Sequence, residues 1–450
     1  MDKEQQKIEK TVIKLKNVSD SFCLAKWYQL TLYLQNGFNH SCHHPSPHKI
    51  PIEEIKKNYK ALHNTRFKKE QMQLMLDGKR PSECDYCWKA EDNGNISDRV
   101  YKSASSWALP HLDTVVENKT NDIEPTYLEI SFSNVCNFKC AYCSPDLSSQ
   151  WYGEIEKHGA YPTSQRYNGF DWFKQVGKMP IKHSEQNPYV DAFWEWWPEL
   201  YDKVETLRLT GGEPLLSKDV WRMLDEIEAN PKPNLVLAIN TNLCVDRELI
   251  DRLIVKVNNI KKHIREVQLF TSGEATFAQA EYMRFGLNYK EWQGNLEHLL
   301  QNTNCIVAVM TTVNLTSINS YCDFVRYLLD LRGYHNKFAS FNKVQFMTNF
   351  LRYPEFLALP ILDTDSKKQF AIEVEKLIEE RGKWDGFATL TYSEVDQLRR
   401  MVNYMRSDDE RVNLLRADFK LFVDEYDRRR GTDFKTVFPE LIEFYKLCQP

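Results

Sequence analysis

Three cysteines within eight residues, Cys136, Cys140 and Cys143, constrain this chain more than any other feature of its sequence. They follow directly on a short apolar run, Tyr127–Ser131, which the pattern predicts to be a buried strand. Three thiolates at this spacing fit one side of a cubane iron–sulfur cluster, because each binds a different iron and the fourth iron stays open to substrate. Zinc sites favour four protein ligands in paired C-x₂-C motifs, so the triplet favours a cluster over zinc.

Residues from about Pro125 to Pro360 alternate short apolar runs with helix-length amphipathic stretches. Such alternation predicts parallel βα units. Six predicted strands are too few for the ordinary eight-stranded barrel, so the pattern alone allows an open partial barrel or a doubly wound sheet. The predicted strands are Tyr127–Ser131, Val204–Leu209, Leu235–Ile239, Val267–Phe270, Ile306–Thr312 and Val344–Phe346, and the predicted helices include Val220–Ala229, Arg247–Ile260 and Tyr321–Leu331.

The C-x₃-C-x₂-C run, with an aromatic residue before its last cysteine, resembles the signature of the radical S-adenosylmethionine (SAM) superfamily. The segment Thr210–Pro214, at the end of the second strand, is similar to the family's GGEP motif, whose backbone and acidic side chain meet the SAM amino group. Polar residues at the ends of the third and fourth strands resemble the ribose- and carboxylate-binding positions. The residues thereby implied to contact SAM are Tyr142, Gly211, Gly212, Glu213, Asn240, Asn242, Ser272, Glu274 and Arg284.

This resemblance implies an α/β fold with a partial (β/α)₆ TIM-like barrel, whose site lies at the carboxyl ends of the strands. It implies a [4Fe–4S] cluster with SAM chelated to the unique iron, and a reductant such as flavodoxin or ferredoxin. One-electron reduction would cleave SAM to methionine and a 5′-deoxyadenosyl radical, which abstracts a hydrogen atom so that the substrate is oxidised, crosslinked or isomerised. The sequence assigns no residue a catalytic role of its own.

A second set of cysteines, Cys23, Cys42, Cys84 and Cys87, precedes the predicted barrel. Cys23 and Cys42 flank two short predicted strands with an Asn-Gly turn, and four thiolates suit either zinc, slightly favoured on general grounds, or an iron–sulfur cluster. The spacing Cys23-x₁₃-Gly37-x₄-Cys42 is similar to the opening of SPASM and twitch domains, which hold auxiliary [4Fe–4S] clusters. This resemblance favours a fully ligated auxiliary cluster that transfers electrons, although such domains usually follow the barrel.

Histidines lie beside the second cysteine set, at His43, His44 and His48. We favour surface or hydrogen-bonding roles for these histidines. The alternative is that one of them is a metal ligand. A long stretch between the first two barrel strands, Ser144–Lys203, is rich in aromatic residues. It is expected either to cover the active site or to pack an extra helical layer.

Composition limits the partners. The net charge is −4 and no basic stripe or helix-turn-helix pattern appears, so no nucleic-acid partner is expected. No segment reaches the ~20 apolar residues of a membrane span, and residues 1–16 lack the apolar core of a signal peptide. We therefore expect a cytoplasmic protein with reduced cysteines and three regions: an auxiliary-cluster domain (1–118), the partial barrel (119–362) and a helical C-terminal region (363–450).

The leading functional hypothesis is a radical SAM enzyme acting on a ribosomal peptide. A small-molecule or nucleotide-derived substrate is the alternative, because nothing in the sequence separates these classes. A non-catalytic iron–sulfur or zinc scaffold is a remote third possibility, since it would leave the strand-end motifs without a role.

Overall fold

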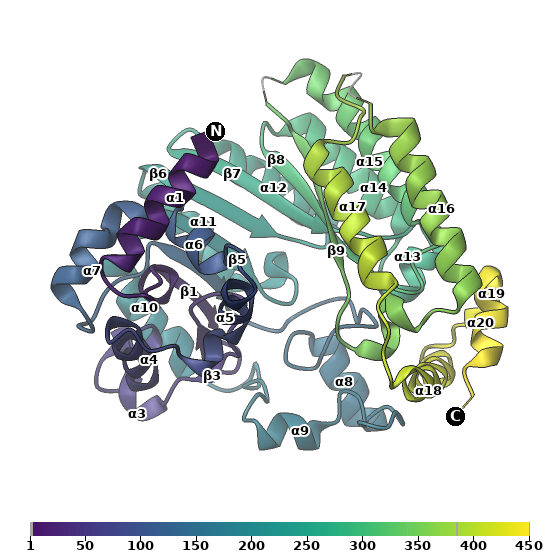
Figure 1. The fold of residues 1–450 in the computed structure, drawn as a ribbon, viewed down its shortest axis with the longest axis horizontal. Helices are drawn as coiled ribbons and strands as arrows, with labels where there is room; N and C mark the ends of the chain where they lie inside the picture. The colour runs from purple at the N-terminus through teal and green to yellow at the C-terminus, as the bar shows by residue number, and fades with distance from the viewer. Residues whose placement is uncertain (1–2, 340, 384–385, 450) are drawn as a thin grey trace. The chain divides into compact units, whose positions relative to one another are not determined.

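A computed structural model describes residues 3–339, 341–383 and 386–449 of the chain (Figure 1). Residues 1–2, 340, 384–385 and 450, which fall in the three regions predicted from the sequence, lie outside the described residues. Within the described part, no helix is both long enough and apolar enough to cross a membrane.

The described residues form a mixed α/β structure with nine strands in the order β3-β2-β1-β4-β5-β6-β7-β8-β9. A doubly wound sheet reverses its strand order at a switch point, whereas the order from β4 to β9 here follows the sequence, which argues against that alternative. The partial barrel stays a prediction. All six strands predicted from the sequence are present: β4 (Tyr127–Ser131), β5 (Thr206–Thr210), β6 (Lys232–Asn240), β7 (Ile264–Ser272), β8 (Ile306–Val313) and β9 (Val344–Phe350).

The chain forms two compact units. The first contains residues 1–133, 180–211 and 232–238, and the second contains residues 134–179, 212–231 and 239–450. These boundaries cross those of the three predicted regions, so the three-domain division stays a prediction.

In the first unit, β1 (Gln29–Tyr33) pairs in parallel with β4 and antiparallel with β2 (Phe38–His40), which pairs with β3 (His48–Lys49). Successive side chains of a strand point to opposite faces of the sheet, so Leu128 and Ile130 of β4 lie on the same face. Both are fully buried, and they pair with the equally buried Leu207 and Leu209 of β5. The helices of this unit are α1 (Lys3–Lys16), α2 (Ala25–Tyr28), α3 (Ile52–Ile55), α4 (Arg66–Leu76), α5 (Asp85–Asp92), α6 (Asp98–Ser103), α7 (Leu112–Asn118) and α10 (Pro188–Tyr201).

The sequence of residues 52–76 has the amphipathic pattern of one good helix, but the structure divides it into α3, a short 3₁₀ turn (Tyr59–Leu62) and α4. Side-chain caps explain the restarts: Asn58 accepts a hydrogen bond from the Lys60 amide, and Thr65 accepts one from the Lys68 amide. Such caps begin new helices wherever they satisfy the free amides of a first turn.

In the second unit, β7, β8 and β9 pair in parallel, and α15 and α17 pack on β9 (Figure 1). The helical character predicted for the C-terminal region is confirmed. The helices are α8 (Ser149–His158), α9 (Phe170–Gln175), α11 (Lys218–Ala229), α12 (Arg247–Ile260), α13 (Phe277–Met283), α14 (Tyr289–Asn302), α15 (Tyr321–His335), α16 (Thr364–Arg381), α17 (Tyr392–Met405), α18 (Val412–Arg430), α19 (Phe434–Val437) and α20 (Ile442–Leu447).

Candidate functional site

The cysteine loop, which we define as residues 134–143, has no regular secondary structure and carries Cys136, Cys140 and Cys143. All three cysteines are free thiols and are partly exposed. The loop takes its shape from backbone hydrogen bonds to the last residue of α13 and to the segment just after it. The Ala141 amide donates to the Met283 carbonyl at 2.7 Å, and the Lys139 amide donates to the Phe285 carbonyl at 3.0 Å.

The loop carries three free thiols, each of which can bind a different iron of a cubane cluster. Among the described residues, no group of three Cys, His, Asp or Glu side chains is placed to hold a single metal ion. Burial raises the pKa of Cys136 to about 12, so binding a metal there would release a proton.

The GGEP-like turn lies against the cysteine loop as closely as glycine permits. A Cβ on Gly212 would lie 2.3 Å from the Val135 carbonyl oxygen and 2.8 Å from that of Asn134. The next amide, of Glu213, donates to the same Val135 oxygen at 2.7 Å. Gly211 has a φ of +136°, which L side chains rarely adopt. The predicted glycine pair therefore has a physical reason at both positions.

The Glu213 carboxylate ties this turn to the end of β6. It is 1% exposed, and it accepts hydrogen bonds from the amides of Leu215 at 3.0 Å and Asn242 at 2.6 Å. Burial raises the pKa of Glu213 to about 7 despite these hydrogen bonds. Asn242 also donates from its side chain to Asn137 of the cysteine loop at 2.7 Å.

A buried ion pair holds the other side of the loop. Arg284 pairs with Glu274 at 2.6 Å, and the Tyr142 hydroxyl donates to the same carboxylate at 2.9 Å. The Arg284 guanidinium also reaches the Cys140 sulfur at 4.0 Å. Three residues predicted to contact SAM are thus brought together beside a predicted cluster ligand. Asn240 and Ser272 are the last residues of β6 and β7, and their contacts with SAM stay predictions.

The aromatic insertion supplies contacts that the sequence did not reveal. The Trp151 indole donates to the Cys140 carbonyl at 2.7 Å, and the Tyr167 hydroxyl donates to the carbonyls of Cys143 at 2.9 Å and Ala141 at 3.2 Å. Later aromatic residues of the insertion, on α10, are buried in the first unit as a packing layer. The packing alternative therefore describes the later part of this stretch, and coverage of an active site by its first part stays a prediction.

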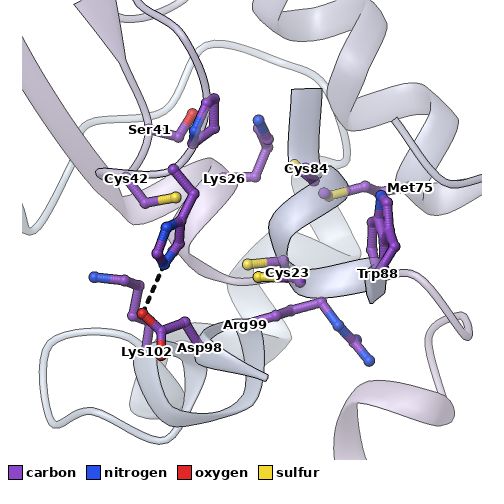
Figure 2. Close-up of a pocket in the computed structure, with 14 residues that line it drawn as sticks. Cys23, Lys26, Ser41, Cys42, Met75, Cys84, Trp88, Asp98, Arg99 and Lys102 are labelled. Atoms are coloured by element: carbon purple, nitrogen blue, oxygen red, sulfur yellow. Dashed lines mark hydrogen bonds and ion pairs between the residues drawn. The ribbon is translucent and has the colours of Figure 1, made fainter. Parts of the chain in front are cut away.

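The second cysteine set is also brought together. Cys23, Cys42, Cys84 and Cys87 line one cavity in the first unit, with about 390 Å³ of space between protein atoms, part of it open to solvent. Figure 2 shows the sulfurs of Cys23 and Cys42 pointing into this space. Burial raises the pKa of Cys84 to about 12 and that of Cys87 to about 11.

Polar side chains around this cavity already have protein partners. Lys26 is buried in an ion pair with Glu83, and His44 bonds to Asp98 at 2.7 Å. His48 bonds to the Thr65 hydroxyl at 2.9 Å. The hydrogen-bonding role favoured for the neighbouring histidines is confirmed for His44 and His48.

The similarity to enzymes called GTP 3′,8-cyclases, which are radical SAM enzymes, supports assignment of the chain to the radical SAM superfamily. The cyclase of Klebsiella pneumoniae is 29% identical over 116 residues, which cover 26% of this chain and 26% of that enzyme. The cyclase of Nautilia profundicola is 24% identical over 266 residues, covering 56% of this chain and 66% of the relative.

Among solved structures, Streptococcus suis SuiB bound to SAM aligns with a TM-score of 0.36 and 12% identity, over 79% of this chain and 68% of that one. No protein-family profile matches the chain.

Proposed function

We propose that this protein is a radical SAM enzyme, which uses SAM and a [4Fe–4S] cluster held by Cys136, Cys140 and Cys143 to remove a hydrogen atom from an organic substrate. The observation that carries the proposal is the convergence of three strand ends on the cysteine loop. The GGEP-like turn, Asn242 and the Glu274–Arg284 pair all contact it. SAM bound at this cluster would be cleaved to methionine and a 5′-deoxyadenosyl radical by one electron, which a reductant such as flavodoxin or ferredoxin would supply through the cluster.

The chain's own residues position and shield the reacting groups. Glu213 and Asn242 fix two strand ends against the loop, and Gly212 lets the backbone approach it. The buried Trp151 and Tyr167 cover the loop's carbonyls. Exclusion of water by such groups protects a reactive radical from side reactions. A loop held rigidly by these contacts keeps the radical and the substrate's C–H bond aligned.

A ribosomal peptide is our first candidate substrate, and a nucleotide-derived substrate is the second. The similarity to GTP 3′,8-cyclases favours the second candidate, although the matched segment spans about a quarter of the first of those relatives. GTP itself is the probe that tests it: a cyclised nucleotide formed together with 5′-deoxyadenosine would support a nucleotide substrate. SAM cleavage that leaves GTP unchanged would favour the peptide.

The first experiment is anaerobic reconstitution with iron and sulfide, followed by dithionite and SAM. We expect 5′-deoxyadenosine from the wild-type protein and none from Cys140→Ala, because one iron of the cluster would lose its ligand. Cys305→Ala, which removes a thiol buried elsewhere in the same unit, is the matched control and should keep the activity. Normal cleavage by the Cys140 variant would overturn the proposal.

We further propose that the cavity of the first unit holds a second, SPASM- or twitch-like [4Fe–4S] cluster on Cys23, Cys42, Cys84 and Cys87. Its support is that all four thiols line one cavity. Zinc is the alternative. The double variant Cys84→Ala/Cys87→Ala should lower the iron content from about eight to about four atoms per chain and leave the SAM-binding cluster in place. Unchanged iron with loss of zinc would establish the alternative.

A further inference from the structure

Arg430, the last residue of α18, lies beside the cysteine loop although it belongs to the helical C-terminal region, far from the loop in the sequence. Its side chain is 0% exposed. One guanidinium nitrogen donates to the Lys139 carbonyl at 2.7 Å. That carbonyl belongs to the peptide bond immediately before Cys140. Arg430 therefore holds the backbone of the loop directly.

A carboxylate from α8 fixes the guanidinium in place. Glu154 accepts from Arg430 through both oxygens, at 3.1 Å and 3.2 Å. It also pairs with the Lys139 ammonium at 2.7 Å and accepts from the Tyr161 hydroxyl at 2.6 Å. Burial alone would raise the pKa of Glu154, but Arg430 and these donors lower it to about 2, so the carboxylate is charged at neutral pH.

Aromatic rings enclose the same guanidinium. Its central carbon lies 3.9 Å from the Tyr426 ring centroid and 4.8 Å from that of Trp151. Trp151 donates to the Cys140 carbonyl, so Arg430 and Trp151 together hold two successive carbonyls of the loop. A planar guanidinium suits this position, because it stacks on rings while its edge donates several hydrogen bonds.

We infer that Arg430 is a positioning residue for the cluster-binding loop, and that its buried positive charge beside Cys140 favours the reduced form of the cluster. The inference rests on the proposed function for its second half. A cluster becomes more negative on reduction, and a nearby buried cation stabilises that added charge. The first half concerns the protein alone, so it is testable without iron.

The test of positioning uses the metal-free protein. In the native loop the Ala141 amide bonds to Met283 at the end of α13, and the Lys139 amide bonds to Phe285 just after it. In Arg430→Gln, both amides should exchange with deuterium roughly tenfold faster or more. That is the fold-change expected when a buried hydrogen bond to a charged donor is lost. Arg428→Gln is the matched control, because Arg428 lies on the same helix, is 61% exposed and pairs only with Glu425 among the described contacts. Unchanged exchange in a folded Arg430→Gln protein would overturn the positioning role.

The test of the charge uses the reconstituted protein and an EPR-monitored redox titration. Arg430→Gln should shift the potential of the SAM-binding cluster to more negative values, whereas Arg430→Lys, which keeps the charge, should restore most of it. An unshifted potential in Arg430→Gln would refute this half. If circular dichroism shows that Arg430→Gln is unfolded, Arg430→Met is used in its place. Its unbranched side chain has a length similar to the aliphatic part of arginine. If the wild-type protein itself binds no cluster, the proposed function fails, while the exchange experiment still decides the positioning role.

Discussion

At Gly286 the chain needs a residue without a side chain. This glycine has a φ of +111°, and a Cβ there would lie 2.8 Å from the Asn137 carbonyl oxygen and 3.0 Å from the Phe138 ring. Both neighbours belong to the cysteine loop. No sequence motif singles out this position, because Gly286 lies outside every recognised motif. Its importance comes from the close approach of two segments that are distant in the chain.

We expect Gly286→Ala to lower the free energy of unfolding by about 1–2 kcal/mol, because alanine does not readily adopt the positive φ at this position. The clash of the added Cβ with the cysteine loop should lower it further. Urea unfolding measures the change, and the iron retained after reconstitution shows whether the loop is displaced. Gly294→Ala is the control, because that glycine lies in α14 with nothing within 4 Å of an added Cβ. There alanine should stabilise by up to about 1 kcal/mol. Equal effects of the two substitutions would contradict the argument.

Among the elements, the aromatic insertion (Ser144–Lys203) holds the cysteine loop by hydrogen bonds in addition to packing against its neighbours. Its first part, around α8, fastens the cysteine loop through polar groups carried on buried rings. Tyr167 is the test case, since its single hydroxyl serves the carbonyls of both Cys143 and Ala141. Asn168, the next residue, donates to the Cys143 carbonyl as well, at 2.9 Å.

Tyr167→Phe should keep the ring packing and remove only the hydroxyl. We expect a loss of about 1–3 kcal/mol in unfolding free energy, because the Ala141 carbonyl loses a buried donor. The rate at which EDTA or oxygen removes iron from the reconstituted protein should rise in parallel. Tyr392→Phe is the control, since Tyr392 is 90% exposed. A variant as stable as wild type, with unchanged iron loss, would show that the hydroxyl does not fasten the loop.

Elements were predictable from sequence where one physical rule dominated. Apolar runs of strand length gave β4 to β9, and helical periodicity gave α11, α12 and α15. The rule failed over residues 52–76, because the caps at Asn58 and Thr65 divide an amphipathic pattern that looks continuous. The aromatic insertion could not be assigned to one role, since ring-rich composition does not reveal which surface the rings cover.

For the molecule as a whole, the site could be predicted only where its residues form local motifs. The cysteine triplet and the GGEP-like turn are such motifs. Arg430 is not, because Arg428, Arg429 and Arg430 look like the solvated basic end of a helix. Yet the side chains of Arg429 and Arg430 are buried, and their partners come from segments far earlier in the chain. A pairing of that kind has no signal in local sequence.

The separation between Lys139 and Arg430 is 291 residues, and it has a consequence for biosynthesis. At ~5–20 residues per second, a ribosome would add Arg430 roughly 15 to 60 s after the loop cysteines. During that interval the nascent loop lacks the guanidinium and Glu154 lacks its main counter-ion. Trp151 and Tyr167 are added soon after the thiols, but the loop gains its full set of contacts only when translation reaches the end of α18.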